Sequence, residues 1–198
     1  ASSPEELQAL LIQEVSSLLT AIEPSPNPLF TSDKPNTPEV WLVVGVNGAG
    51  KTTYLRDLAS KRGVLVPQPA SDLLFLNTVD DELRQADLDA KNPLGTTAGL
   101  FKNFVADDLG ESNPRDLSQG QKLALAISIQ MAKQSELLML DEPTLGFDLP
   151  TRQTLVNLIG SITETGTQVI VATHDLEFAW AISDDIQTIE NMRLAHVG

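Results

Sequence analysis

Apolar residues along the chain follow two different periods, which divide it into alternating strands and helices. Short runs rich in Val, Ile and Leu predict buried strands at residues 40–44, 63–68, 137–140, 168–173 and 186–189, with a short return strand at 193–196. Apolar residues at helical spacing predict helices at residues 51–61, 79–87, 99–109, 116–133, 150–163 and 176–182. Strands that are apolar on both faces and alternate with helices predict an α/β fold, with a mostly parallel sheet covered on both sides.

The N-terminal part has a different pattern. Residues 4–22 place seven apolar side chains on one helical face, and Ser3 with Glu6 matches a capping box at its start. Residues 23–39 hold five prolines and predict an extended connector. No Lys or Arg precedes Lys34, so attraction to anionic lipid is missing and we expect this helix to pack against the sheet.

Composition narrows the class of protein. The chain has 198 residues, no cysteine and a net charge of -14. This length suits one well-buried domain, and the charge opposes binding of nucleic acid through a broad basic face. No apolar run approaches the length that spans a membrane, and the N-terminus lacks the basic flank of a secretion signal. We therefore expect a cytoplasmic protein, with any membrane association made through a partner.

A glycine-rich segment after the first strand carries the clearest chemistry. Residues 45–53 match the phosphate-loop pattern G-x-x-x-x-G-K-[ST] between a predicted strand and a predicted helix. Glycines let backbone N–H groups turn inward around a phosphate, and the helix adds its positive end. Lys51 would reach the β and γ phosphates, and Thr52 would hold Mg²⁺. The predicted nucleotide-binding residues are Asn47, Gly48, Ala49, Gly50, Lys51, Thr52 and Thr53. A glycine turn that binds nothing is the alternative.

Three further candidates follow two of the predicted strands. Asp141 and Glu142 come directly after residues 137–140, and His174 follows residues 168–173. Ligands gather at the carboxyl ends of parallel strands, so Asp141 suits a Mg²⁺ ligand and Glu142 a general base that polarises water. Solvated turn acids and a structural histidine are the alternatives.

The order of these motifs resembles the nucleotide-binding domain of an ABC transporter. The matching segments are Walker A at 45–53, a Q-loop at Gln68, a signature at 117–121, Walker B at 137–142, a D-loop near Asp148 and a switch histidine at His174. Residues 74–83 are similar to the energy-coupling-factor branch. The resemblance implies that Gln68 senses Mg²⁺ and the attacking water, and that His174 contacts the γ phosphate. It further implies that Ser118 and Gly120 contact a nucleotide held by a second copy, in a homodimer. Ser118 and Asp148 could equally act as helix caps.

Several departures from that family matter. Only fourteen residues separate Thr53 from Gln68, so the usual antiparallel strands have no room. Residues 7–59 instead resemble the signal-recognition-particle receptor GTPase of the FtsY type, although its later guanine-reading motifs are absent. This favours a chimera, engineered or natural and even of de novo origin, joined near residues 53–62; a natural ABC protein with a degenerate front end is the alternative. Gln119 and Ala124 also depart from the signature pattern, which points to weakened turnover.

Together these features predict a P-loop NTPase. We expect a helix and linker over residues 1–39 and the NTPase domain over 40–198, with a small helical subdomain at 69–133. The expected function is Mg-ATP binding with weak ABC-type hydrolysis, in a motor subunit that partners a membrane transporter if the chain is natural. The alternative is a chimeric fold that binds nucleotide or phosphate without hydrolysing it.

Overall fold

The computed structural model describes residues 40–44, 50–182, 186–190 and 193–196. By its contacts the chain divides into two units, residues 1–35 and 36–198. The predicted N-terminal helix and connector lie outside the described residues, as do Asn47, Gly48 and Ala49 of the glycine-rich segment. The domain boundary after residue 39 and the resemblance of residues 7–59 to a receptor GTPase therefore stay predictions.

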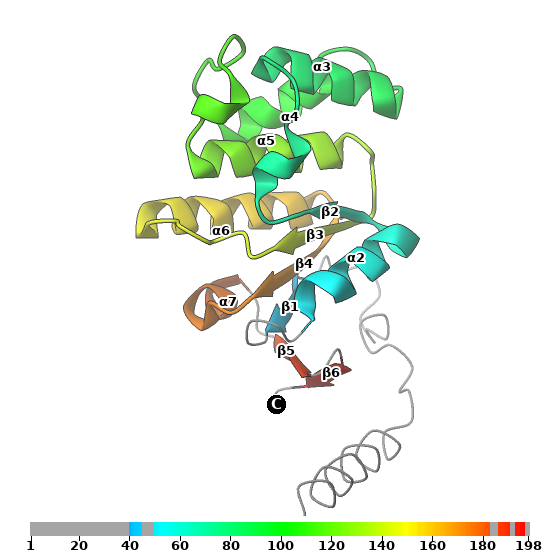
Figure 1. Cartoon of the computed structure of the whole chain (residues 1–198), viewed down its shortest axis with the longest axis vertical. Helices are drawn as coiled ribbons and strands as arrows, with labels where there is room; N and C mark the ends of the chain where they lie inside the picture. The colour runs from blue at the N-terminus through cyan, green and yellow to red at the C-terminus, as the bar shows by residue number, and fades with distance from the viewer. Residues whose placement is uncertain (1–39, 45–49, 183–185, 191–192, 197–198) are drawn as a thin grey trace, which may run out of the picture. The chain divides into compact units, whose positions relative to one another are not determined.

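The predicted mostly parallel sheet is confirmed within the described part of the chain. Its strands lie in the order β2-β3-β4-β1-β5-β6 (Figure 1). Strands β1 to β5 run parallel, and only β6 pairs antiparallel, with β5. Their bounds are β1 Val40–Val44, β2 Val64–Val66, β3 Leu137–Asp141, β4 Gln168–Thr173, β5 Ile186–Glu190 and β6 Arg193–His196.

Helices lie between the successive parallel strands along the chain, as the apolar periods predict. Their bounds are α2 Lys51–Arg62, α3 Val79–Ala90, α4 Thr96–Phe104, α5 Gln119–Met131, α6 Leu149–Glu164 and α7 Leu176–Ile182, with short 3-10 turns η2 Ala70–Leu73 and η3 Pro114–Asp116. None of the described helices is long and apolar enough to cross a membrane.

One predicted helix is displaced. The sequence pattern indicated residues 99–109, whereas α4 spans Thr96–Phe104. It begins earlier because the backbone N–H groups of Gly95 and Thr97 both donate to the carboxylate of Asp87, at 2.7 and 2.9 Å, which satisfies the start of the helix. It ends at Val105, whose backbone is extended. The capping acid lies in the preceding helix, so the local pattern could not reveal it.

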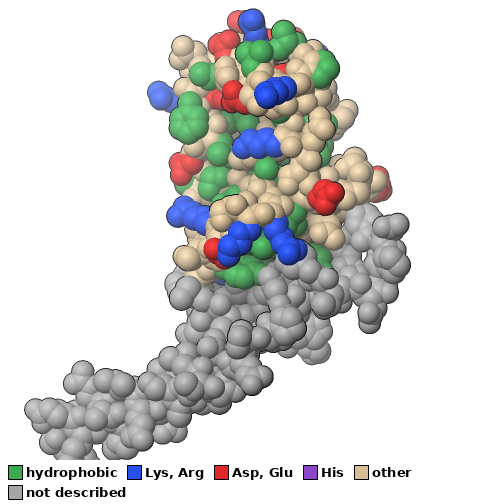
Figure 2. Space-filling model, turned by 90° about the vertical axis from the view of Figure 1, so that its right-hand side faces the viewer, with side chains coloured by type: hydrophobic (Ala, Val, Ile, Leu, Met, Phe, Trp, Pro, Cys, Tyr) green, Lys and Arg blue, Asp and Glu red, His purple; other side chains and the backbone are tan. Residues whose placement is uncertain are grey.

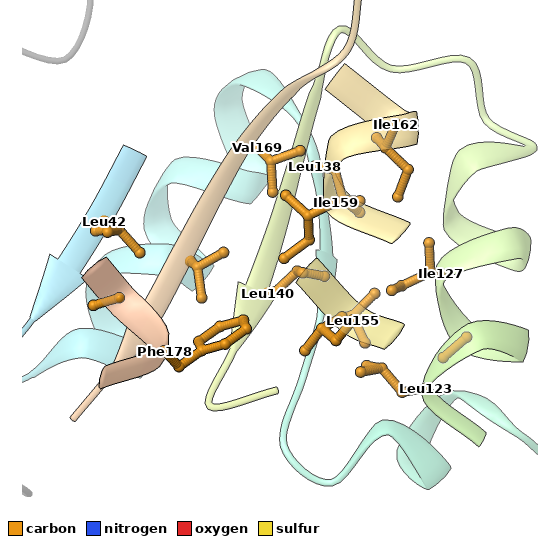
Figure 3. Close-up of a cluster of buried hydrophobic side chains, with 14 residues drawn as sticks. Leu42, Leu123, Ile127, Leu138, Leu140, Leu155, Ile159, Ile162, Val169 and Phe178 are labelled. Atoms are coloured by element: carbon orange, nitrogen blue, oxygen red, sulfur yellow. The ribbon is translucent and has the colours of Figure 1, made fainter. Parts of the chain in front are cut away.

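The main core lies on one face of the sheet. Leu138 and Leu140 of β3 share this face with Val169 and Val171 of β4, and all four are buried. Figure 3 shows side chains of α6 and α7, such as Ile159 and Phe178, packed on these strands, with α5 beside them. Because successive side chains of a strand point to opposite faces, Met139 faces α2 on the other side. Helices therefore cover both faces, as predicted.

A second core joins α3, α4 and α5. Its buried members are Val79, Leu83, Phe101, Leu117, Ala124 and Leu125. Helix α5 contributes to both cores, because its Leu123, Ala126 and Ile127 pack instead toward the sheet. The helical group is thus attached to the sheet mainly through α5, and Phe104 of α4 also packs against both cores.

Charged side chains of both signs are scattered over the face of the described residues seen in Figure 2. On the face in Figure 2, Lys and Arg side chains lie interspersed with Asp and Glu over the described residues. The exclusion of nucleic acid as a partner rests on the charge of the whole sequence and stays a prediction.

Gly63 marks a place where α2 turns tightly into β2. An added Cβ would lie 2.6 Å from the carbonyl oxygen of Leu137 and 2.9 Å from Cε of Met139. We expect Gly63→Ala to lower the free energy of unfolding by about 1–3 kcal/mol, because a backbone oxygen cannot easily retreat. Gly160→Ala in α6 is the matched control, because nothing lies within 4 Å of its added Cβ. This substitution should raise the free energy of unfolding by about 0.5–1 kcal/mol. Urea unfolding measures both, and equal effects would contradict the steric explanation.

Asp87 gives a second prediction, for pH dependence. Its carboxylate is only 1% exposed, and burial alone would raise its pKa, but hydrogen bonds from Thr97 and Gly95 hold the pKa below the usual 3.8. A lowered folded-state pKa means that the stabilisation is complete above about pH 4 and is lost as the pH falls through the folded value. Asp87→Asn should therefore lower stability at pH 7 by about 1–3 kcal/mol, and the deficit should shrink below pH 4 in urea titrations. Exposed Asp89→Asn should change little at either pH; a deficit independent of pH would contradict the assignment.

Candidate functional site

The candidate residues meet because three parallel strands end at the same level. Val44 of β1 pairs with Thr173 of β4, and Asp141 of β3 pairs with Ala172. The glycine-rich segment, Glu142 and His174 each follow one of these strand ends. The register of the sheet thus brings together groups that are far apart in the sequence.

Glu142 lies between the two cationic candidates. Its Oε1 atom is 3.1 Å from Nζ of Lys51, and its Oε2 atom is 2.8 Å from Nδ1 of His174. Lys51 and Glu142 are only 6% and 9% exposed, whereas His174 is half exposed. A buried carboxylate needs such partners, because an unpaired charge out of water is costly. The sequence did not predict a direct contact between Lys51 and Glu142.

The backbone of Glu142 is held in an uncommon conformation. Its φ is +48°, in the left-handed region that residues other than glycine rarely adopt. Its N–H donates to the carbonyl of Ala172 at 2.8 Å, and the N–H of His174 donates to Oε2 of Glu142 at 3.3 Å. Such conformations cost about 1–3 kcal/mol and persist where the surroundings hold them. Here the neighbouring strand holds the turn and directs the carboxylate toward Lys51.

Asp141 and Thr52 form the part of the site that suits a cation. Asp141 is 4% exposed and accepts a hydrogen bond from the Thr52 side chain, while its Oδ1 atom has no hydrogen-bond partner. Burial raises the pKa of the Asp141 carboxyl, and Glu142 adds to this, while the Thr52 bond and Lys51 oppose it. A hard cation favours oxygen ligands of this kind and would offset the buried negative charge. These residues therefore fit Mg²⁺.

Gln68 lies at the rim of the same site. It follows β2, is exposed, and lines a cavity of about 260 Å³ together with Asp141, Glu142 and Gln119. The short connection from α2 thus still carries the glutamine to the acidic pair. Its proposed role toward Mg²⁺ and water stays a prediction.

The remaining residues of the glycine-rich segment lie at the start of α2. Gly50 is the residue before the helix, with φ of +95°, and its carbonyl accepts the N–H of Tyr54 at 2.9 Å. A positive φ explains why this position is glycine. The Thr53 side chain is exposed, and no described contact ties it to the acidic pair. Its nucleotide role stays a prediction.

The two signature candidates lie elsewhere. Ser118 caps α5: its hydroxyl accepts the N–H of Gln121, whose side chain accepts the N–H of Ser118. The predicted cap is confirmed. Ser118 and Gly120 line a separate cavity of about 560 Å³ between the end of α4, the start of α5 and α6. Within one chain they therefore do not join Lys51 and Glu142, and their contact with a second copy stays a prediction.

The structure also shows two features near the site that bear on α6. Asp148 accepts the N–H of Thr151 at 3.0 Å, which confirms its predicted role as the cap of this helix. Arg152, in the first turn, forms an ion pair with Asp175, directly after His174. No periodic pattern in the sequence reports this pair, because it depends on how α6 packs beside the turn between β4 and α7.

The buried ion pair yields a prediction that needs no ligand. Lys51→Met should lower the free energy of unfolding by about 2 kcal/mol, less than the ~3–5 kcal/mol typical of a stranded buried charge, because His174 can still pair with Glu142. Adding Glu142→Gln should recover most of that loss in chemical denaturation. Lys61→Met removes an exposed ion pair with Asp57 and should cost less than about 1 kcal/mol. A double variant as unstable as the sum of the two single variants would contradict the contact.

Comparison with known proteins points in one direction. A family model described as "AAA domain, putative AbiEii toxin, Type IV TA system" matches residues 54–179. The chain is 36% identical over 167 residues to a "Putative ABC transporter ATP-binding protein" of Streptomyces avermitilis, covering 71% of this chain and 30% of that protein. It is 29% identical to the "Cobalt import ATP-binding protein CbiO" of Rhodobacter capsulatus, covering 81% and 68%.

Solved structures agree on the fold. The structure of cbiO1 from Clostridium perfringens, described as part of the ABC transporter complex cbiONQ, has a TM-score of 0.69 at 22% identity and covers 79% of this chain and 75% of that one. By contrast, the chain spans about 30% of the length of the Streptomyces relative.

Proposed function

We propose that this chain, which belongs to the family described as "AAA domain, putative AbiEii toxin, Type IV TA system", is an ABC-type nucleotide-binding domain. In this proposal it binds ATP with Mg²⁺ and hydrolyses the ATP. Homology to ATP-binding proteins of ABC transporters supports the proposal. The observation that carries it is the position of Glu142, between Lys51 and His174 and directly after the buried Asp141.

The residues present match the needs of phosphoryl transfer to water, which depends on positioning and on neutralising charge. Lys51 would bind phosphate oxygens, and Thr52 with Asp141 would hold the Mg²⁺, which supplies positive charge at the phosphates. Glu142 would orient the attacking water and accept its proton. His174 would hold the outer side of the phosphate group. In this arrangement an incoming γ phosphate competes with Glu142 for Lys51, and its entry frees the carboxylate to face the water.

A specific observation favours a second candidate function. Gln119 stands where the signature pattern has glycine. This departure would weaken nucleotide-dependent turnover. The alternative is therefore a fold that binds nucleotide or phosphate without hydrolysing it.

The interpretation as a chimera belongs with these proposals. The join that the sequence predicts near residues 53–62 falls within the continuous helix α2. Leu55 and Leu58 of this helix are buried against the sheet. The helix thus packs normally, whatever the origin of the segment before it.

Partners follow from the names of the relatives. CbiO of Rhodobacter capsulatus is named for cobalt import, and an energy-coupling factor transporter ATP-binding protein of Carboxydothermus hydrogenoformans is 27% identical. We propose that this chain likewise works in the cytoplasm at the membrane, through a transporter subunit.

Phe75, 78% exposed, provides an apolar surface, and Glu82 anchors its loop by accepting the N–H groups of Phe75 and Leu76. A homodimer through Ser118 and Gly120 would complete each nucleotide site.

The decisive experiment is phosphate release from Mg-ATP as a function of protein concentration. The rate per chain should rise with concentration, because two copies are needed, and Glu142→Gln should lower it by about 10²–10⁴-fold. Glu164→Gln, at an exposed position in α6, is the matched control and should keep the full rate. Wild-type turnover equal to that of Glu142→Gln would overturn hydrolysis. Titration with labelled ATP would then separate the binding alternative from a protein that binds no nucleotide.

A further inference from the structure

We propose that Arg152 is a positioning residue for the reaction, which holds His174 against Glu142 through the carboxylate of Asp175. This inference rests on the proposed function. Nη1 of Arg152, in the first turn of α6, lies 2.7 Å from Oδ2 of Asp175. The side chains are 32% and 15% exposed, so the pair is partly shielded from water.

Asp175 is held from several directions. Its N–H donates to Oγ1 of Thr173 at 3.0 Å, and its Oδ1 atom accepts the N–H of Phe178 at 3.1 Å, at the start of α7. Its carbonyl accepts the N–H of Ala179 at 3.0 Å. The two oxygens of the Asp175 carboxylate thus have different partners: Oδ1 accepts a hydrogen bond from α7, and Oδ2 pairs with Arg152. The residue directly before it is His174, so the direction of the His174 ring depends on this anchor.

The place of Arg152 in its own helix calls for a reason. The N-terminal end of a helix carries partial positive charge, which disfavours a cation in the first turn. In addition, the buried Nε atom of Arg152 has no hydrogen-bond partner, and such a donor costs free energy. The ion pair between the Arg152 guanidinium and Asp175 offsets these two unfavourable contributions. The Asp148 cap fixes the same turn of α6, so the backbone that carries Arg152 is held in place.

The consequence is a chain of contacts from α6 to the site. Arg152 holds Asp175, Asp175 directs the turn after β4, and His174 in that turn meets the Glu142 carboxylate. Loss of the Arg152 side chain should leave the phosphate-binding residues in place. The His174 ring, however, should then adopt several orientations instead of one. The chemical step should therefore suffer more than nucleotide binding.

A double-variant cycle tests this on the hydrolysing protein. Arg152→Met should lower kcat by about tenfold, with KM within about twofold, and it should add little to the loss caused by His174→Ala, because both act through one group. Arg152→Lys should restore part of the rate. Lys61→Met, which breaks the exposed pair with Asp57, should change neither constant. Independent, multiplying losses for Arg152→Met and His174→Ala would overturn the proposal.

A second measurement does not depend on turnover. The sequence contains two histidines, His174 and His196, so His174→Ala assigns the imidazole signals in an NMR spectrum. Arg152→Met should shift the His174 signal, and so should Asp175→Asn, which keeps an acceptor for Phe178 but loses the charge. An unchanged His174 signal in both variants would overturn the positioning role. Failure of the proposed function is seen separately, as a wild-type rate no greater than that of Glu142→Gln.

Discussion

A charged carboxylate is costly to bury unless nearby cations or hydrogen-bond donors offset its charge, and this constraint governs the end of the sheet. Glu142 meets it with Lys51 on one side and His174 on the other. None of the three could reach the others without the parallel pairing of β1, β3 and β4. The register of the strands, set by their buried apolar faces, is therefore what makes the site.

The candidate site also contains groups in conformations or surroundings that lower the stability of the folded chain. Glu142 has a left-handed backbone, and Asp141 is buried with an oxygen that lacks a hydrogen bond. Elsewhere buried acids are well satisfied, as in Asp87, whose carboxylate accepts two backbone N–H groups and the Thr97 hydroxyl. Packing alone would favour other residues at these two positions, which supports the role proposed for Asp141 and Glu142.

Helix α6 links several parts of the molecule. Its inner face contributes Leu155, Ile159 and Ile162 to the core on the sheet. Its first turn holds the Asp148 cap and the ion pair from Arg152 to the turn after His174. The same helix lines the cavity beside Ser118 and Gly120. This well-packed helix thus contacts Asp175, directly after His174, and lines the cavity whose residues are proposed to face a second copy.

The sequence by itself determined the types and order of the elements, since the period of apolar residues reports which face is buried whatever lies opposite. It also placed Asp141, Glu142 and His174 at strand ends and Lys51 at the start of a helix, because these positions follow directly from the predicted element boundaries. Only the tertiary structure decided the start of α4, the contact of Lys51 with Glu142, and the pairing of Arg152 with Asp175. Each of these joins groups from different elements, and such contacts arise from packing, which leaves no periodic trace in the sequence.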